Sequence, residues 1–178
     1  MKSIYCIEHL NKPLTIFEVS HSNVTYEELL EIVDLKMTVW KYPKESQLEW
    51  IKQNVYNEDI HYLMYNKDML IAYLCVCAVN LKIGENCTSV FGLSNVCVRN
   101  NMQKMGLGTL IVNKILEKYN NNPILLLTTY KNVSFYEKIG FNRYSGNLYI
   151  MNKIDENTIC FFKNIDLNYE NISIDRSF

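Results

Sequence analysis

The chain has 178 residues, of which 48% are apolar and 21% charged, the balance of a globular protein with enough chain to bury a core. Eighteen Lys and Arg residues against nineteen Asp and Glu residues leave a net charge of −1, which argues against a nucleic-acid binder. No apolar run reaches the ~18 residues of a membrane helix, and no signal-peptide core is present, so we expect a cytoplasmic protein without a membrane partner. We expect one domain over residues 1–178, with its core at about 14–162 and a C-terminal tail at 163–178.

The six cysteines and three histidines do not show the spacing of a metal site. No Cys-x-x-Cys pair occurs, and His9, His21 and His61 lie far apart in the sequence. We therefore expect no metal, and without a secretory signal we expect reduced cysteines. Cys75 and Cys77 are two residues apart in an apolar run, so a strand would place both on one face, toward the core.

The first half of the chain predicts a strand, two helices and three more strands. The segment 14–19 indicates a strand. Thr25 and Glu28 have the spacing of a capping box, and helical apolar spacing continues from there to Trp40. A second helix is predicted around residues 48–55. Three strands rich in Tyr, Ile, Val and Leu, separated by polar turns as in an antiparallel meander, are predicted at 61–65, 69–79 and 88–98.

The second half predicts two helices and three strands. Helical apolar spacing runs over 107–119 directly after a glycine-containing loop, and the apolar strand 124–127 follows. A short helix at 132–139 is expected to end at Gly140. For the polar tail at 163–178, the sequence leaves open whether it pairs with the sheet. The last two strands are predicted at 147–151 and 158–162. The order β-α-α-β-β-β-α-β-α-β-β predicts an α+β fold with a mixed sheet.

The junction at 98–111 is the segment that indicates chemistry. A strand ends, Gly106 and Gly108 follow, and a helix begins. The first turn of a helix has unpaired backbone N–H groups and partial positive charge, and glycines let a phosphate approach the backbone. The spacing predicts a pyrophosphate cradle, or else a tight turn that happens to use two glycines. A dinucleotide fingerprint would need a third glycine, and a P-loop would need Gly-Lys-Ser/Thr.

Two segments together resemble the GNAT superfamily of N-acetyltransferases. Val96-Cys97-Val98 followed by Gln103-Lys104-Met105-Gly106-Leu107-Gly108 is similar to its acetyl-CoA signature, Gln/Arg-x-x-Gly-x-Gly/Ala. The run at 132–141, with Asn132, Tyr136 and a final Gly-Phe, is similar to its second motif. The resemblance covers about residues 14–162. It implies a three-layer fold in which about four helices flank a twisted, mixed, mostly antiparallel sheet with a central strand–loop–helix–strand acetyl-CoA site.

The resemblance also implies roles for the residues of these motifs. Main-chain groups near Val96 and Val98 would bind the pantetheine arm of acetyl-CoA, and the backbone N–H groups of 103–108 would bind its pyrophosphate. The residues implied in cofactor binding are Val96, Cys97, Val98, Gln103, Lys104, Met105, Gly106, Leu107, Gly108, Thr109, Asn132, Phe135 and Tyr136. The four-residue spacing of Asn132 and Tyr136 lets them share a helix face toward the cofactor, with Phe135 and Ile139 toward the core.

Acyl transfer to an amine needs a proton acceptor, an oxyanion donor and an acid for the leaving thiolate. Tyr136 resembles the family's acid, although a packed aromatic with a satisfied hydroxyl is the alternative, and an N–H near Val98 is the expected oxyanion donor. Many relatives carry a glutamate before the Val-x-Val segment, whereas residues 91–95 contain no carboxylate. Ser94 or Asn95 is expected to order a water that carries the proton away.

Other charged residues have two interpretations each. Four glutamates in the N-terminal helices either face the acceptor or form a solvated helix face: Glu28, Glu31, Glu45 and Glu49. Three cations either contact phosphates on the adenosine side or are ordinary exposed cations: Arg99, Lys104 and Lys131.

The sequence is consistent with two classes of function. The first is an enzyme that acetylates a primary amine, either a small molecule such as an aminoglycoside or polyamine, or a protein amine. The second is a catalytically weak or inactive acyl-CoA-binding module with the same fold, which the missing carboxylate favours. Either protein is expected to be a monomer or a homodimer.

Overall fold

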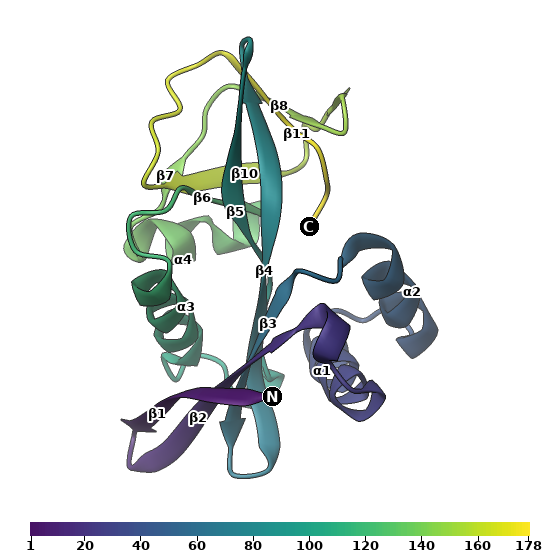
Figure 1. Ribbon diagram of the computed structural model, residues 1–178. Helices are drawn as coiled ribbons and strands as arrows, with labels where there is room; N and C mark the ends of the chain where they lie inside the picture. The colour runs from purple at the N-terminus through teal and green to yellow at the C-terminus, as the bar shows by residue number, and fades with distance from the viewer. The chain divides into compact units, whose positions relative to one another are not determined.

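The computed structural model describes residues 1–178 and contains two compact units (Figure 1). Unit 1 consists of Met1–Val76 and Asn95–Lys118, and unit 2 consists of Cys77–Ser94 and Tyr119–Phe178. Strands β4 (Met69–Ile83) and β5 (Asn86–Val98) each contribute residues to both units. Helices and strands are mixed in the manner of an α+β fold, as predicted. The single domain over 1–178 stays a prediction.

The sheet of unit 1 is antiparallel throughout. Its order is β1 (Lys2–His9), β2 (Lys12–Ser20), β3 (Ile60–Asn66) and the first part of β4. The predicted strands at 14–19 and 61–65 are confirmed. The sequence did not indicate β1, because this edge strand has no fully buried residue and therefore lacks a clear apolar alternation.

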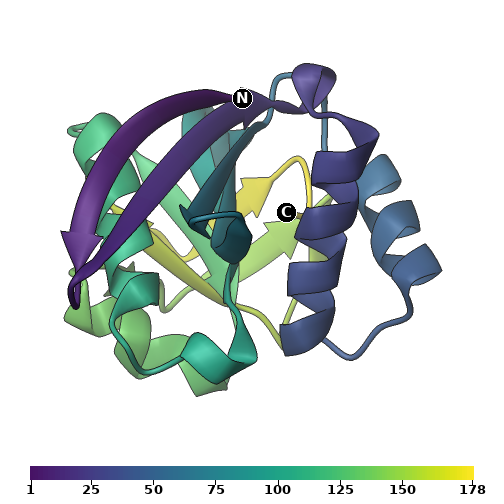
Figure 2. The same ribbon diagram turned by 90° about the horizontal axis from the view of Figure 1, so that it is seen from below.

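Two helices of unit 1, α1 (Tyr26–Val39) and α2 (Lys44–Asn54), lie side by side (Figure 2). The predicted capping box is present, because the Thr25 hydroxyl accepts from the Glu28 N–H at 3.2 Å and the Glu28 carboxylate accepts from the Thr25 N–H at 2.8 Å. The apolar face of α1 packs into a core with residues of the sheet. That core includes Val19, Ile32, Val33, Leu35, Leu63, Tyr73, Cys75 and Cys97.

The third helix of unit 1 is α3 (Leu107–Lys118), which confirms the prediction at 107–119. A short 3-10 turn, η2 (Asn100–Met102), separates it from the end of β5. The helix buries an apolar stripe of Leu107, Ile111, Val112 and Ile115. Near its other end, Lys118 forms an ion pair with Glu18 on β2, so both ends of α3 are joined to strands of the same unit.

Unit 2 contains the second motif. The first part of β5 pairs in parallel with β6 (Ile124–Thr128), which pairs with β10 (Ile159–Lys163), and β10 pairs with β7 (Asn142–Arg143). After β6, the 3-10 turn η3 (Tyr130–Asn132) leads into α4 (Val133–Lys138). Gly140 ends this helix as predicted, with a φ of +83° that glycine adopts without strain.

The C-terminal tail pairs with the sheet of unit 2. Strand β11 (Asn171–Ile174) is antiparallel to β4 and parallel to β8 (Asn147–Ile150), and β8 pairs with β9 (Lys153–Ile154). Ile172 and Ile174 of the tail are each 1% exposed. Burial of these two apolar side chains stabilises the pairing of the otherwise polar tail with the sheet. The sequence did not predict β7 and β9, because two residues show no periodicity.

Candidate functional site

The expected site residues divide between the two units. Unit 1 contains 95–98 and the whole loop and helix start at 103–109. Unit 2 contains Ser94 and the second-motif residues Asn132, Phe135 and Tyr136. We call residues 99–109 of unit 1, which follow the Val96–Val98 strand segment, the cradle, and residues 132–141 of unit 2 the second motif.

The cradle begins with a loop that is folded onto the end of β5. The Gln103 side chain donates through Nε2 to the Val98 carbonyl at 3.1 Å and to the Asn100 side-chain oxygen at 3.0 Å. The Met102 N–H donates to the Arg99 carbonyl at 2.8 Å. The signature glutamine therefore closes the loop, which fixes where the backbone of the following residues lies.

The backbone of the cradle has left-handed residues at alternate positions. Lys104 has a φ of +63° and Gly106 a φ of +78°. Alternation of left-handed and right-handed residues turns successive N–H groups toward one concave side, a geometry that binds anions. The positive φ at Gly106 is a backbone requirement that explains why a glycine stands there.

Gly106 also starts helix α3. Its carbonyl accepts the Leu110 N–H at 2.9 Å, so the N–H groups of 107–109 precede the first intrahelical hydrogen bond. A Cβ on Gly106 would meet only the His9 ring, at 3.6 and 3.7 Å, which is ordinary contact. The His9 ring therefore lies on the side of Gly106 where a side chain would be, and an anion would be bound by the N–H groups of the helix start, which carry the positive end of the helix dipole.

The strand segment before the cradle offers main-chain groups and not the cysteine side chain. Cys97 is 3% exposed and packs in the core with Tyr73 and Cys75. Burial raises the pKa of its thiol to about 12. At neutral pH Cys97 is therefore a protonated thiol in the core.

Asn95 has an unusual backbone conformation in the middle of β5. Its φ is +53°, which a non-glycine residue seldom adopts within a strand, although asparagine tolerates it better than most. Such positions cost of order 1–3 kcal/mol and gather at functional sites. The distortion lies directly before the Val96–Val98 segment.

The second motif packs an aromatic cluster around Tyr136. Tyr136 is the buried residue of α4, at 6% exposure, with ring centroids 4.9 Å from Phe135, 6.0 Å from Phe141 and 5.9 Å from Phe161. Phe135 and Ile139 are each partly buried, and their expected orientation toward the core stays a prediction. The helix begins one residue later than predicted, and Asn132 is its N-cap, with its side chain donating to the Thr128 hydroxyl at 3.0 Å.

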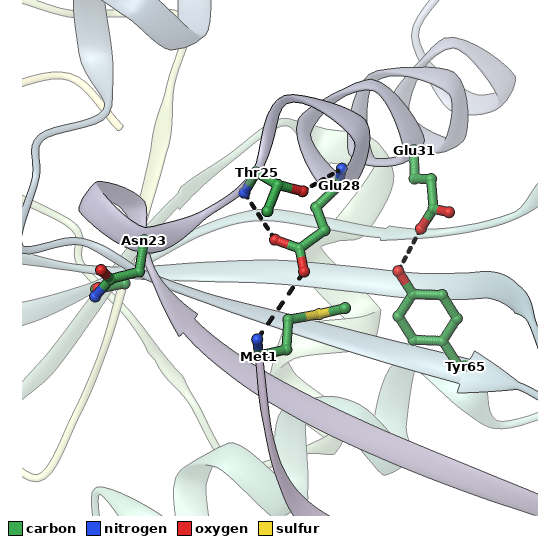
Figure 3. A network of polar contacts seen from close by, with 7 residues as sticks. Met1, Asn23, Thr25, Glu28, Glu31 and Tyr65 are labelled. Carbon is green, nitrogen blue, oxygen red and sulfur yellow. Dashed lines mark hydrogen bonds and ion pairs between the residues drawn. The ribbon is translucent and has the colours of Figure 1, made fainter.

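The glutamates of the N-terminal helices have different environments, and Figure 3 shows those of Glu28 and Glu31. Glu28 is used in the capping box and lies 4.0 Å from the N-terminal amine of Met1. Glu31 accepts a hydrogen bond from the Tyr65 hydroxyl. Burial and this carboxylate raise the pKa of Tyr65. Glu45 and Glu49 are exposed, which agrees with a solvated helix face.

The candidate phosphate-binding cations also differ. Arg99 donates through Nε to the Leu70 carbonyl at 3.1 Å, and its N–H donates to Ile71, so it fastens the cradle to β4. Lys104 and Lys131 are exposed.

Two histidines that are distant in the sequence meet in unit 1. His21 Nδ1 lies 2.9 Å from His61 Nε2, and His61 Nδ1 lies 2.7 Å from the Tyr73 hydroxyl. The expectation that no histidines cluster, which rested on their separation in the sequence, was therefore wrong for this pair. Antiparallel pairing of β2 with β3 sets Ser20 opposite Ile60 and so brings them together. Burial lowers the pKa of His21, and it lowers the pKa of His61 to about 3.

Lys36 is a second buried titratable group that the sequence did not indicate. It is 3% exposed on α1, and its Nζ lies 4.5 Å from the centre of the Trp50 ring and 5.8 Å from that of Trp40. Burial lowers its pKa to about 8. The two indole faces attract the ammonium and offset part of the cost of its burial.

The chain has no helix that is both long enough and apolar enough to cross a membrane. Its six cysteines are all free thiols.

A family model described as an acetyltransferase (GNAT) domain matches residues 21–144. No curated protein matches the sequence. Among solved structures, Escherichia coli ElaA is similar with a TM-score of 0.61 at 18% identity over 84% of this chain and 99% of that one. An aminoglycoside 6′-N-acetyltransferase complexed with coenzyme A has a TM-score of 0.60 at 17% identity over 85% and 98%. The ribosomal-protein-S18-alanine N-acetyltransferase from Escherichia coli has a TM-score of 0.58 at 14% identity over 87% and 97%.

Proposed function

The chain belongs to the GNAT acetyltransferases, and we propose that it transfers the acetyl group of acetyl-CoA directly to a primary amine. The observation that carries the proposal is the cradle of unit 1. A strand end, a loop closed by Gln103, a left-handed Gly106 and the first turn of α3 follow one another there. The left-handed backbone of the loop and the N–H groups at the start of α3 would suit a pyrophosphate.

The donor would be held mainly by the backbone. The Gln103 N–H donates to the Asn100 carbonyl at 3.4 Å, so the N–H groups that follow it, in 104–109, would bind the pyrophosphate. The main chain at Val96 and Val98 would bind the pantetheine arm. Acetyl-CoA supplies a thioester whose acyl carbon is open to attack by a neutral amine. The N–H near Val98 would donate to the carbonyl oxygen as negative charge develops on it.

Two proton transfers complete the reaction. The amine must lose a proton, and Ser94 and Asn95 are proposed to order the water that accepts it, since residues 91–95 contain no carboxylate. Tyr136 is proposed to return a proton to the leaving thiolate. Its ring is fixed by three neighbouring phenylalanine rings, so its hydroxyl has a defined direction. Positioning of amine and donor supplies much of the remaining rate.

The state of Cys97 supports direct attack by the amine. A covalent route would need a thiolate near the donor, whereas burial keeps this thiol protonated, with a pKa of about 12. The proposed acceptor is therefore the amine itself, in a ternary complex with the donor.

The test is release of CoA thiol from acetyl-CoA over a panel of amines. An aminoglycoside and a peptide with an N-terminal alanine open the panel, because enzymes of similar fold act on such amines, and a polyamine and free amino acids complete it. We expect at least one amine to accelerate thiol release, with the acetylated amine detected by mass spectrometry. No binding of CoA at millimolar concentration by calorimetry would contradict the proposal.

The alternative is an acyl-CoA-binding module with little catalysis. The absence of a carboxylate in 91–95 favours it. Binding of CoA without thiol release for any amine in the panel would support this alternative. The cytoplasmic location and the monomeric or homodimeric state belong to both proposals.

A further inference from the structure

The turn of the β1–β2 hairpin places a histidine against the cradle. His9 is the last residue of β1 and pairs with Lys12, and the two residues between them, Leu10 and Asn11, have φ values of +48° and +59°. Two left-handed residues make the tight hairpin turn whose twist matches that of the strands. The position of His9 is therefore set by the backbone of a tight turn.

His9 makes a specific contact with the loop of the cradle. Its Nε2 lies 2.7 Å from the carbonyl oxygen of Met105. Because a carbonyl only accepts hydrogen bonds, Nε2 carries the proton and donates it. The same ring lies against Gly106, at 3.6–3.7 Å from the position of a Cβ on that glycine.

This contact matters for an anion because Met105 lies between the two left-handed residues Lys104 and Gly106. A carbonyl oxygen that turned into the concave side would repel a phosphate and would remove an N–H group from it. A hydrogen bond from His9 holds the Met105 carbonyl on the hairpin side. The neighbouring N–H groups are thereby left on the concave side.

We propose that His9 is a positioning residue for the donor pyrophosphate, acting through the Met105 carbonyl, and that the β1–β2 hairpin forms part of the cradle. The inference rests on the proposed acetyl-CoA site. His9 lies before residues 21–144, which match the family model, so the contact comes from a segment outside that match. Strands β1 and β2, which lie outside the family match, would thus take part in donor binding.

Two substitutions separate the hydrogen bond from the shape of the ring. His9→Gln can keep a side-chain N–H donor and loses the ring, whereas His9→Phe keeps a ring and loses the donor. Lys12→Ala is the matched control, because it removes an exposed cation from the residue opposite His9. Circular dichroism first establishes that each variant folds, and calorimetry then measures the dissociation constants of CoA and dephospho-CoA.

We expect His9→Phe to weaken CoA binding about five- to tenfold, the size of one lost hydrogen bond. His9→Gln and Lys12→Ala should stay within about threefold of wild type. Dephospho-CoA keeps the pyrophosphate and lacks the 3′-phosphate. His9→Phe should therefore weaken the binding of dephospho-CoA by the same factor as the binding of CoA. With an accepting amine, the KM for acetyl-CoA should rise in that variant while kcat changes little.

Three results would overturn the inference. Unchanged CoA affinity in His9→Phe would show that the contact does not position the loop. Weakening for CoA but not for dephospho-CoA would move His9 to the 3′-phosphate. Equal weakening in His9→Gln and His9→Phe would show that the ring matters and not the donated hydrogen bond. If wild type itself binds no CoA, the proposed function fails, which is a separate result.

Discussion

Gly106 shows most clearly how one residue can be required by the backbone. Its φ of +78° depends on the missing side chain, and a Cβ there would lie 3.6 Å from the His9 ring. Gly84 is a useful counterpart, because it has a φ of +59° in a turn with no atom within 4 Å of a Cβ. A non-glycine residue would be strained to a similar degree at both positions, but only Gly106 lies in the cradle.

We expect Gly106→Val to abolish CoA binding while the protein stays folded. A branched side chain would press on the His9 ring, which lies 3.6–3.7 Å from a Cβ at this position, and would strain the left-handed backbone that orients the neighbouring N–H groups. Calorimetric titration with CoA measures the loss. Gly84→Val is the control, since it should lower stability to a similar degree and leave the CoA affinity unchanged. Normal CoA binding by folded Gly106→Val would place the cradle elsewhere.

Tyr136 is the residue for which a chemical and a packing role predict different kinetics. Tyr136→Phe keeps the ring among its phenylalanine neighbours and removes only the hydroxyl. If the hydroxyl is the general acid, turnover should fall by ~10²–10⁴-fold while the affinity for acetyl-CoA changes little. Steady-state kinetics at saturating acetyl-CoA and amine measure this.

Tyr144→Phe is the matched control for that experiment. The Tyr144 hydroxyl donates to the Tyr169 carbonyl at 2.9 Å, so its loss should cost about 1 kcal/mol of stability and no turnover. If Tyr136→Phe behaves in the same way, with turnover within about threefold of wild type, Tyr136 is a packed aromatic.

At the scale of elements, strand pairing in unit 1 brings two histidines and a tyrosine together in the interior. The pairing of β2 with β3 brings His21 to His61, and the pairing of β3 with β4 brings Tyr73 to His61. Burial keeps His61 neutral, with its pKa lowered from 6.5 to about 3. The unfolded chain therefore binds a proton below pH 6.5 that the folded protein does not bind.

This difference predicts a loss of stability in acid. The contribution of neutral His61 is fully present above pH 6.5 and is lost as the pH falls from 6.5 toward 3, by up to ~1.4 kcal/mol per pH unit. Between pH 7 and pH 5 the free energy of unfolding should fall by about 2 kcal/mol from this residue. The lowered pKa of His21 acts in the same direction.

Urea unfolding at several pH values measures the effect in wild type and in His61→Gln. The carboxylates titrate in both proteins, so the difference between the two pH profiles isolates the histidine. We expect a shallower acid slope in His61→Gln, whatever its stability at pH 7. Parallel profiles would show that His61 takes up its proton without unfolding the protein.

Sequence patterns predicted the elements whose residues bury one clear face. Helix α1 was indicated by its capping box and apolar spacing, and α3 by its glycine-containing start. Strand β1 and the tail strand β11 were not predicted, because an edge strand and a strand in a polar segment have weak alternation. The cradle was found from its motif, whereas His9 was not, because its contact depends on a hairpin 96 residues away in sequence.

At the scale of the whole molecule, the proposed function links ligand binding to folding. CoA that binds only the folded state stabilises it by RT ln(1 + [L]/Kd), which is about 2.7 kcal/mol at a hundredfold excess over Kd. For a chain of this length that corresponds to a rise in Tm of roughly 5–10 °C. Differential scanning calorimetry with and without CoA measures the shift.

The same measurement separates specific binding from a general effect of the additive. The Tm of Gly106→Val should not rise when CoA is added. ATP at the same concentration should raise the Tm of wild type less than CoA does, since ATP lacks the pantetheine arm. A shift that is equal in both proteins would count against the cradle as the source of the stabilisation.

The pair of indoles beside Lys36 has a practical consequence for optical work on this protein. The chain contains two tryptophans, and both lie against the Lys36 ammonium, Trp40 directly after α1 and Trp50 within α2. Intrinsic tryptophan fluorescence therefore reports on the α1–α2 pair, and a change of charge at Lys36 would alter the emission of both indoles.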